Sequence, residues 1–373
     1  MLDEVADREP LAVGVLKSLE LSVRRRFLDA TNRPFSGDLV TTPRAAVTLG
    51  PSPRILFLRQ DRIGDVLVSV PVIRALRRAY PDATIHMLFS RTNYDVRGAV
   101  APYVDRSLCY YKTPAAAARL LIELRRGRYD VVVDLMDNPS ANSQFVMGWS
   151  RARYRVGILH ERAGHYTHAV PLLERGRVHV VERIAQLLLP FGIDPAEVPL
   201  DLEYQIGPEA RRRARARLGP LPAGRPLRLG VNISPRYWGR DNFIACIRWL
   251  MKWDPRFAIV VGGSPKQQGE VDAIVAATGA AKMPNVASFE DFAAMIHECD
   301  LVLTPDTSTV HAAAAWKIPM VGLYHWVPGH PALWLPYRSP HRAVVSAEGF
   351  AAIPLREVQE AFRSLVTERF PPR

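Results

Sequence analysis

The chain has 373 residues, enough for two domains of ordinary size. Hydrophobic residues make up 48% of it, which permits a packed core and argues against global disorder. Cys109, Cys246 and Cys299 stand singly without a CxxC pair, so neither a disulfide framework nor a zinc site is indicated. An acidic start and the absence of any run of about 18 apolar residues predict neither a secretory signal nor a transmembrane helix. We therefore expect a cytoplasmic protein.

The formal net charge of +12 is gathered in arginine clusters. These clusters lie at residues 24–26, 77–78, 125–126 and 211–217. They would attract an anionic membrane, at roughly 1 kcal/mol per basic residue near the surface. They would also attract nucleic acid without specificity, or simply cover solvated faces. Because aromatic residues do not interleave with them, nucleic acid is the least favoured partner, and we expect none.

The first 52 residues are predicted to be an extension and a linker. Residues 12–28 have a weak helical period with a basic end, which suits a helix on a membrane interface or one packed on the following domain. Residues 32–53 are rich in Pro, Thr and Gly, as linkers are.

Residues 53–200 alternate between strand and helix patterns. Strands are predicted at 54–59, 83–89, 106–110, 129–135 and 154–158, and helices at 66–80, 115–126, 139–149 and 178–191. Residues 60–65 form the first turn. A loop at 160–173 holds three histidines, but no Cys or carboxylate completes a metal site at usable spacing, so no metal is expected.

The pattern restarts after a proline-containing linker at residues 192–208. Strands are predicted at 227–233, 257–261, 300–304 and 317–323, and helices at 209–218, 242–253, 266–278, 289–298 and 311–316. The second α/β half spans residues 201–350, and a C-terminal helix lies within 351–373. Two parallel sheets are expected to face each other across a cleft, a usual place for a ligand site.

The stretch at residues 304–323, TPDTSTVHAAAAWKIPMVGL, is the strongest local signal for a ligand. A strand leads through Asp306, Thr307, Ser308 and Thr309, all good N-cap types, into a helix of small residues. Unpaired amide N–H groups and the helix dipole at such a start suit an anion such as a diphosphate. The competing interpretation is an ordinary capped helix packed through its alanines.

Two stretches, one in each half, resemble glycosyltransferase family 9, the heptosyltransferase family. Residues 59–67, RQDRIGDVL, with Pro71 resemble its first strand and turn, and residues 305–311, PDTSTVH, resemble its D-[TS]-x-x-x-H turn. Weaker matches lie at 232–243 and 261–265. The resemblance implies a GT-B fold, in which two Rossmann-like domains hold a nucleotide-sugar mainly on the second. It also implies an inverting transfer that needs neither a metal nor another cofactor.

Inverting transfer requires a base that takes the proton of the acceptor hydroxyl as it attacks the anomeric carbon. By the resemblance, Asp65 is that catalytic base, and Gly64 before it belongs to the substrate-binding turn. Asp61 is the reserve candidate. The alternative for Asp65 is that it caps its own helix.

The leaving diphosphate must meet positive charge on the other side. The backbone amides of Thr307, Ser308 and Thr309 are candidates, together with a basic side chain. Arg236 aligns with the family's phosphate-contacting residue, usually Lys there, and Arg240 is a second possibility. A solvated loop charge is the alternative for Arg236.

Three further residues are assigned to the donor by the same resemblance. Ser234 is expected to donate its hydroxyl to the diphosphate. Asp306 is expected to hold its turn or the sugar hydroxyls. His311 is expected to orient the loop or reach a phosphate, although a lone histidine beside alanines is otherwise a core residue.

The chain departs from the family pattern after Gly263. The family often has a carboxylate for the ribose there, whereas this chain has Lys266, Gln267 and Gln268, with Glu270 further on. The residues after Leu323 also depart. Ribose recognition and the base of the nucleotide therefore stay open, and the donor need not be ADP-heptose.

We expect an inverting, metal-independent glycosyltransferase that moves a heptose or related sugar from a nucleoside-diphosphate donor to a lipopolysaccharide-core or other cell-envelope saccharide or glycolipid. We expect it to work at the inner face of the cytoplasmic membrane, in peripheral contact with anionic lipid. The alternatives are a GT-B nucleotide-sugar epimerase and a non-catalytic nucleotide-binding homologue.

Overall fold

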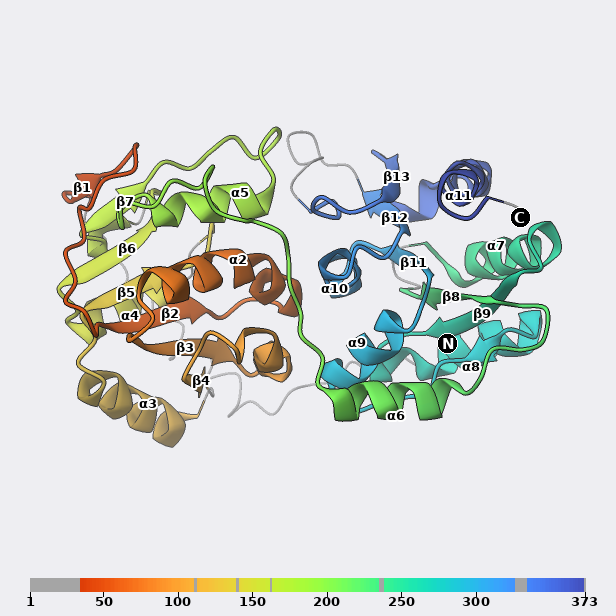
Figure 1. Ribbon diagram of the computed structural model, residues 1–373, viewed down its shortest axis with the longest axis horizontal. Coiled ribbons are helices and arrows are strands. Elements are labelled where there is room, and N and C mark those ends of the chain that lie inside the picture. The colour runs from red at the N-terminus through yellow and green to blue at the C-terminus, as the bar shows by residue number, and fades with distance from the viewer. Residues whose placement is uncertain are drawn as a thin grey trace, which may run out of the picture.

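The computed structural model describes residues 34–110, 113–138, 141–161, 163–234, 238–325 and 334–371. Within them the chain forms two α/β domains that lie side by side (Figure 1). The chain passes from the first to the second along residues 192–207, the segment predicted as the interdomain linker. The predicted helix at 12–28, the arginines at 24–26 and Arg236 lie outside the described residues.

The N-terminal domain is built on a seven-stranded sheet in which every pairing is parallel, in the order β1-β7-β6-β5-β2-β3-β4. Its strands are β1 (Asp38–Leu39), β2 (Arg54–Arg59), β3 (Thr84–Ser90), β4 (Arg106–Tyr110), β5 (Val131–Asp134), β6 (Tyr154–Ile158) and β7 (His168–Val170). The four apolar residues of β2 are fully buried, as expected of a central strand covered on both faces. The predicted parallel sheet is confirmed.

The helices of this domain are α2 (Ile63–Ala79), η1 (Tyr94–Val100), α3 (Pro114–Arg126), α4 (Ala141–Ser150), η2 (Ala163–His165), α5 (Val180–Ala185) and η3 (Gln186–Leu188). Most of these helices connect successive strands, and α5 and η3 follow the last strand, β7. Helix α2 begins three residues earlier than predicted, so Gly64 and Asp65 lie in its first turn rather than in the preceding loop. The early start has a physical cause, because the Asp65 carboxylate accepts the Arg62 N–H at 3.0 Å and caps the helix.

Part of the predicted linker at 32–53 is instead packed onto this sheet. Strand β1 pairs with β7, which lies inside the predicted loop at 160–173. Val40 and Val47 are buried, and Ala45 bridges to Phe191. Strands of two and three residues are too short to show an alternating pattern, which explains why the sequence did not predict β1 and β7.

The C-terminal domain has a six-stranded parallel sheet in the order β10-β9-β8-β11-β12-β13. Its strands are β8 (Leu227–Asn232), β9 (Phe257–Gly262), β10 (Ala281–Lys282), β11 (Leu301–Pro305), β12 (Met320–His325) and β13 (His341–Ser346). The two edge strands, β10 and β13, were not predicted. The four central strands, β9, β8, β11 and β12, were predicted from their apolar runs.

The helices of the C-terminal domain are α6 (Pro208–Leu218), α7 (Arg240–Trp253), η4 (Pro265–Gln267), α8 (Gln268–Thr278), α9 (Phe289–His297), α10 (Ser308–Ala315), η5 (Phe350–Ala352) and α11 (Leu355–Arg369). Helix α11 is the predicted C-terminal helix, and it packs against β12, β13 and α7 through buried residues such as Phe362. None of the helices in the described ranges is long and apolar enough to cross a bilayer.

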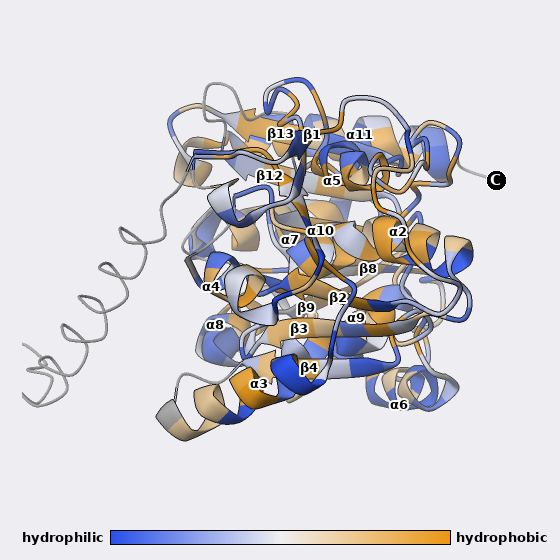
Figure 2. Ribbon diagram, turned by 90° about the vertical axis from the view of Figure 1, so that its left-hand side faces the viewer, coloured by the Kyte–Doolittle hydropathy of each residue, from blue (hydrophilic) through white to orange (hydrophobic). Residues whose placement is uncertain are grey.

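The two domains are packed together rather than merely tethered. One cluster of buried apolar side chains includes residues of both, and α2 lies against α10. Polar contacts add to it: the Tyr337 hydroxyl donates to Glu182 at 3.1 Å, and Nε2 of His179 lies 2.8 Å from the Leu335 carbonyl oxygen. Figure 2 shows apolar strands inside and polar helix faces outside.

The arginine cluster at 211–217 serves packing between two helices. From α6, Arg213 and Arg217 pair with Asp291 of α9 at 2.7 and 2.9 Å, and Arg215 pairs with Glu298 just after α9 at 2.8 Å. This part of the net charge is therefore matched within the domain and needs no external partner.

Candidate functional site

A cavity of about 340 Å³ lies where the carboxyl ends of β8, β9 and β10 meet the starts of α9 and α10. Most of its lining belongs to the C-terminal domain, and Ile63 and Asp95 contribute from the N-terminal domain. Its position outside the carboxyl ends of a parallel sheet is the usual ligand site of such folds. The volume suits a nucleotide-sized ligand.

One end of the cavity is apolar. Met283, Pro284, Val286 and Phe292 line it, and the ring and aliphatic surfaces form a slot for a flat, weakly polar group. Gly263 keeps the slot close to the sheet, because a Cβ there would lie 3.1 Å from the Ile233 side chain.

The other end is a polar cluster around Asn232, the last residue of β8. Its amide nitrogen lies 3.0 to 3.1 Å from the hydroxyl oxygens of Thr304, Thr307 and Thr309 and shares its two hydrogens among these three acceptors. Thr307 is the N-cap of α10, and its hydroxyl accepts the Thr309 N–H at 3.3 Å. One buried amide thus fixes the end of β11 and the start of α10, so the amides of the first helical turn are held toward the cavity.

The structure brings four of the predicted donor residues together here. Ser234, Thr307, Ser308 and Thr309 all line the cavity. Arg240 is not part of the lining; its guanidinium pairs with both oxygens of Glu270 at 2.6 Å on the outer side of the domain. The role predicted for Arg240 therefore has no geometric support, and it stays a prediction.

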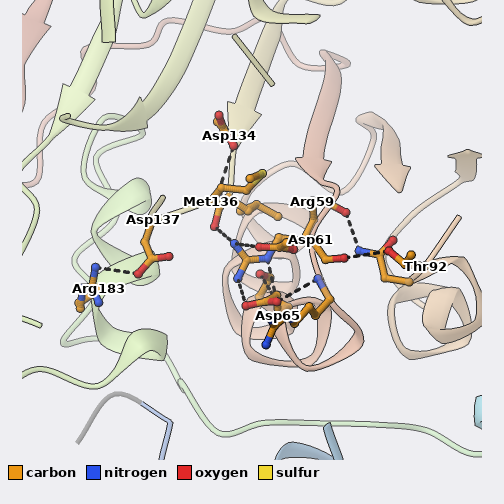
Figure 3. Close-up of polar contacts among 12 residues, drawn as sticks. Arg59, Asp61, Asp65, Thr92, Asp134, Met136, Asp137 and Arg183 are labelled. Carbon is orange, nitrogen blue, oxygen red and sulfur yellow. Dashed lines mark hydrogen bonds and ion pairs between the residues drawn. The ribbon is translucent and has the colours of Figure 1, made fainter. Parts of the chain in front are cut away.

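The N-terminal domain presents a polar cluster at the domain boundary, called the N-terminal wall below, and it centres on Arg59, whose side chain is fully buried at the end of β2 (Figure 3). Arg59 and Asp65 are not among the residues that line the cavity. It donates from Nε to the Asp65 carbonyl at 2.9 Å and from Nη1 to the Leu135 carbonyl. Its Nη2 lies 3.5 Å from Asp65 Oδ1. The buried guanidinium therefore orients the first turn of α2, including the predicted base.

The sequence left open whether Asp65 caps its helix or serves as a base, and the structure shows what each of its two oxygens contacts. It caps its helix through Oδ2, as the Arg62 contact shows, and its other oxygen keeps only the long contact with Arg59 among the described residues. The side chain is 12% exposed. Capping therefore occupies one carboxylate oxygen and leaves the other to the contact with Arg59.

Asp61 is a second carboxylate on the same arginine. Its Oδ2 lies 3.4 Å from Arg59 Nη1, while its Oδ1 is buried without a hydrogen-bond partner in the described structure. Burial raises the pKa of Asp61 to about 7, since loss of solvation outweighs the attraction of Arg59.

Behind these residues lies a buried polar layer at the end of β5. The Tyr166 hydroxyl donates to Asp134 at 3.0 Å, and burial raises the pKa of Asp134 to about 6. Arg183 of α5 pairs with Asp137 at 2.7 Å (Figure 3). This layer supports the wall from behind and does not line the cavity.

The pKa of Asp306, in the C-terminal domain, responds to charged residues of the N-terminal domain. Burial raises its pKa to about 6; Arg62 of the other domain opposes that shift and Asp65 adds to it. The charges of Arg62 and Asp65 therefore act on the pKa of Asp306 across the domain boundary.

His311 is buried and neutral. Burial lowers its pKa to about 3, and its Nδ1 has no hydrogen-bond partner in the described part of the chain. Its ring lies against Gly64 and 5.8 Å from the Trp334 ring. The residue packs two domains together, and at neutral pH it would bring no positive charge to a phosphate.

Several lining residues were not predicted. Met283 and Pro284 follow β10, whose two residues are too short to recognise, and Asp95 lies in η1 on the other domain. Asn232 could have been found, because a polar residue closing an apolar strand beside a Gly-rich strand end is a ligand signal in such sheets. Across the described residues no group of three or more His, Cys, Asp or Glu side chains is arranged to hold a metal ion.

The model of one protein family matches residues 117–360 of this chain, and its description is glycosyltransferase family 9 (heptosyltransferase). Lipopolysaccharide heptosyltransferase 3 of Escherichia coli (strain K12) is 24% identical over 282 residues, which cover 70% of this chain and 79% of that protein. Lipopolysaccharide heptosyltransferase 2 of Salmonella typhimurium (strain LT2) is 23% identical over 346 residues, covering 86% and 96%.

Solved structures share the fold. The family 9 glycosyl transferase of Veillonella parvula DSM 2008 superimposes with a TM-score of 0.71 at 20% identity, over 85% of this chain and 97% of that one. The E. coli heptosyltransferase WaaC with ADP gives 0.65 at 16% identity, over 84% and 99%. The predicted fold, two Rossmann-like domains in the GT-B arrangement, is confirmed.

Proposed function

This chain belongs to glycosyltransferase family 9, the heptosyltransferase family, and from that premise we propose that it transfers a sugar from a nucleoside-diphosphate donor to a saccharide of the lipopolysaccharide core or a related cell-envelope glycolipid. The transfer inverts the anomeric carbon in one displacement. The sugar is a heptose or a related one.

The observation that carries the proposal is the two-ended cavity. Its apolar slot at Met283 and Phe292 suits a nucleobase, and its other end is the start of α10, where helix amides suit a diphosphate. Ser234 stands beside that helix start and can donate its hydroxyl to a phosphate oxygen. The donor would then lie with its base in the apolar slot and its diphosphate at the start of α10, with the ribose between them and the diphosphate on the side of Asp65.

Asp65 is the base in this proposal. An acceptor hydroxyl bound against the first turn of α2 would donate to Asp65 Oδ1, the oxygen not used in capping. As the hydroxyl oxygen bonds to the anomeric carbon, its proton passes to the carboxylate and the bond to the diphosphate breaks. Arg59 holds the turn in place during that step, since it binds the Asp65 carbonyl.

Charge on the leaving diphosphate is met by the helix start. The start of α10, capped by the bond from the Thr309 N–H to the Thr307 hydroxyl, supplies oriented backbone dipoles that need no rearrangement as charge develops. The transfer is therefore proposed to be metal-independent. Asp306, next to the cap, would accept from sugar hydroxyls.

A direct experiment tests the function. The protein is first screened for thermal stabilisation by ADP, UDP, GDP and CDP, since a ligand of the folded state raises the apparent stability. The nucleotide that binds is then supplied as its heptose donor with a deacylated lipopolysaccharide-core acceptor. We expect release of nucleoside diphosphate and a product of inverted anomeric configuration. A free nucleotide sugar of altered configuration would indicate an epimerase, and no binding of any nucleotide would contradict the proposal.

Membrane contact is proposed for the outer face around α3. A hollow of about 540 Å³ there is lined by Arg54, Arg106, Arg119 and Arg126. Arg119 and Arg126 have no ion-pair partner within the described ranges, and Ile122 between them is 52% exposed. Exposed basic and apolar side chains on one helix suit an anionic lipid surface, and Figure 2 shows both kinds on α3.

Sedimentation with phosphatidylglycerol vesicles tests this contact. We expect binding at low salt that weakens at high salt, and Arg126→Glu should reduce it. Arg225→Glu, on an exposed loop of the other domain, is the matched charge control. Equal binding of the two variants would contradict the assignment of the face.

A further inference from the structure

The ribose of the donor has no evident partner on the C-terminal domain, although that domain supplies most of the cavity. We propose that Asp95, which reaches the cavity from the N-terminal domain, accepts hydrogen bonds from the two ribose hydroxyls. The inference rests on the proposed function, because it assigns one part of the same nucleotide.

Polar side chains on the C-terminal side are largely committed to capping. The Gln267 amide oxygen accepts the Ser264 N–H at 3.1 Å. Ser288 accepts a first-turn N–H of α9 at 3.1 Å, and Thr307 caps α10. Each of these neutral acceptors lines the cavity and already receives one backbone N–H, so an ionised carboxylate would be the stronger acceptor for a diol.

The carboxylate that Rossmann-type domains commonly place on a ribose is also missing from this side. The loop after β9 carries Gln267 and Gln268, and the next acid, Glu270, is bound at both oxygens by Arg240 at 2.6 Å. Glu270 does not line the cavity. Of the described residues that do, Asp95 is the one carboxylate.

Asp95 is held in a defined place. It lies in η1, which packs against α9, and the preceding Asn93 is completely buried. Asn93 donates to the Arg59 carbonyl at 2.9 Å and accepts the Ser90 N–H at 2.9 Å, so η1 is anchored to the ends of β2 and β3. Within the described structure the Asp95 carboxylate has no hydrogen bond or ion pair, and it is exposed on the cavity side.

The chemistry fits a vicinal diol. A carboxylate accepts two hydrogen bonds from adjacent hydroxyls, and bonds to an ionised acceptor are stronger than neutral ones. Phosphates would be repelled by Asp95, whereas the diol carries no charge. Because base and ribose would then be held by different domains, the nucleotide would favour the packed arrangement of the two.

The test compares ADP with 2′,3′-dideoxy-ADP by calorimetric titration of the whole protein. The wild type should bind ADP about tenfold more tightly, the factor expected for loss of charge-assisted hydrogen bonds. Asp95→Asn and Asp95→Ala should weaken the binding of ADP and leave the binding of dideoxy-ADP unchanged. The ratio of the two dissociation constants should therefore fall from about ten toward one. Asp82→Asn, at an exposed turn of the same domain, should keep the tenfold preference.

The outcomes distinguish failure of the ribose assignment from failure of the proposed function. Equal binding of the two nucleotides by the wild type, or an undiminished preference in both Asp95 variants, would overturn the ribose assignment while the proposed transferase function stands. If neither ADP nor dideoxy-ADP binds but another nucleoside diphosphate does, the comparison is run with that nucleotide and its dideoxy form. Absence of binding by every nucleoside diphosphate would overturn both proposals.

Discussion

Gly64 and His311 touch across the boundary between the two domains. A Cβ built on Gly64 would lie 2.9 Å from Cδ2 of the His311 ring, closer than such atoms approach in proteins. The first turn of α2, which carries Asp65, therefore packs directly on α10, which carries the proposed diphosphate site. The distance between base and leaving group is set by a contact that tolerates no side chain at position 64.

Gly64→Ala should force this contact apart. Overpacking of a buried contact costs about 1–3 kcal/mol, so the free energy of unfolding should fall by that amount. Turnover should fall as well, because the base moves relative to the donor. Urea unfolding and steady-state kinetics would measure the two effects.

Two comparisons sharpen that experiment. Gly98→Ala, in η1 of the same domain, adds a methyl group where nothing lies within 4 Å, so it should leave both quantities nearly unchanged. The double variant Gly64→Ala with His311→Ala should lose less stability than the sum of the single changes. If the losses in free energy of unfolding are strictly additive, the two side chains do not interact in the folded protein.

Asp65→Asn should abolish transfer and leave nucleotide binding intact. An amide keeps an oxygen that can accept the Arg62 N–H, so the cap and the melting temperature should hold, while a proton acceptor is lost. A fall in kcat of about 10²- to 10⁴-fold is expected. Retained turnover with donor and acceptor at saturation would remove Asp65 from the role of base.

Asp61 should make stability depend on pH. Its pKa is raised to about 7 in the folded state and is about 3.9 when unfolded, so between those values the folded state binds more protons. The contribution of protonated Asp61 to the free energy of unfolding is complete below pH 4. It is lost as the pH rises from 4 through 7, at no more than about 1.4 kcal/mol per pH unit. Asp61→Asn mimics the protonated form, so it should be nearly as stable as the wild type at pH 3.5 and more stable than the wild type at pH 8, with the difference growing between pH 4 and pH 7.

Urea midpoints at the two pH values check this prediction. Asp82→Asn is the control and should run parallel to the wild type, since its side chain is exposed after α2. A difference between Asp61→Asn and the wild type that does not change with pH would mean that folding does not raise the pKa of Asp61.

Asn232→Ala should loosen the start of α10. The buried amide joins three threonine hydroxyls, and its loss leaves them without their shared donor. We expect nucleotide affinity to fall by about tenfold, or ~1.4 kcal/mol. Asn242→Ala also removes a side-chain hydrogen bond, to the Trp238 carbonyl at 2.7 Å, but lies outside the cavity and should bind nucleotide normally.

Transfer should continue in excess EDTA. In the proposed mechanism, oriented amides at the start of α10 meet the diphosphate charge, so removal of divalent cations should not lower kcat. The rate is measured before and after chelation and after Mg²⁺ is restored. Loss of the rate on chelation and its recovery with Mg²⁺ would contradict the metal-independent mechanism.

Local patterns in the sequence were enough to predict the central strands and most helices. The run from Arg54 to Arg59 is buried on both faces, and the apolar spacing along α2 follows its helical period. The strands β1, β7 and β10 are two or three residues long, so their pairing depends on neighbours distant in sequence. The capping sequence at Asp306 to Thr309 indicated an anion site, since the unpaired amides of a helix start are a local property.

Tertiary structure alone decided how those local sites meet. No spacing in the chain shows that Gly64 lies against His311, that Arg240 turns outward to Glu270, or that Asp95 reaches a cavity built by the other domain. The raised pKa values of Asp61 and Asp306 come from burial, which the packing of whole domains produces. Composition and short motifs determined the fold class and the two halves of a site, and packing between the domains determined their distance, charge and ligand-facing atoms.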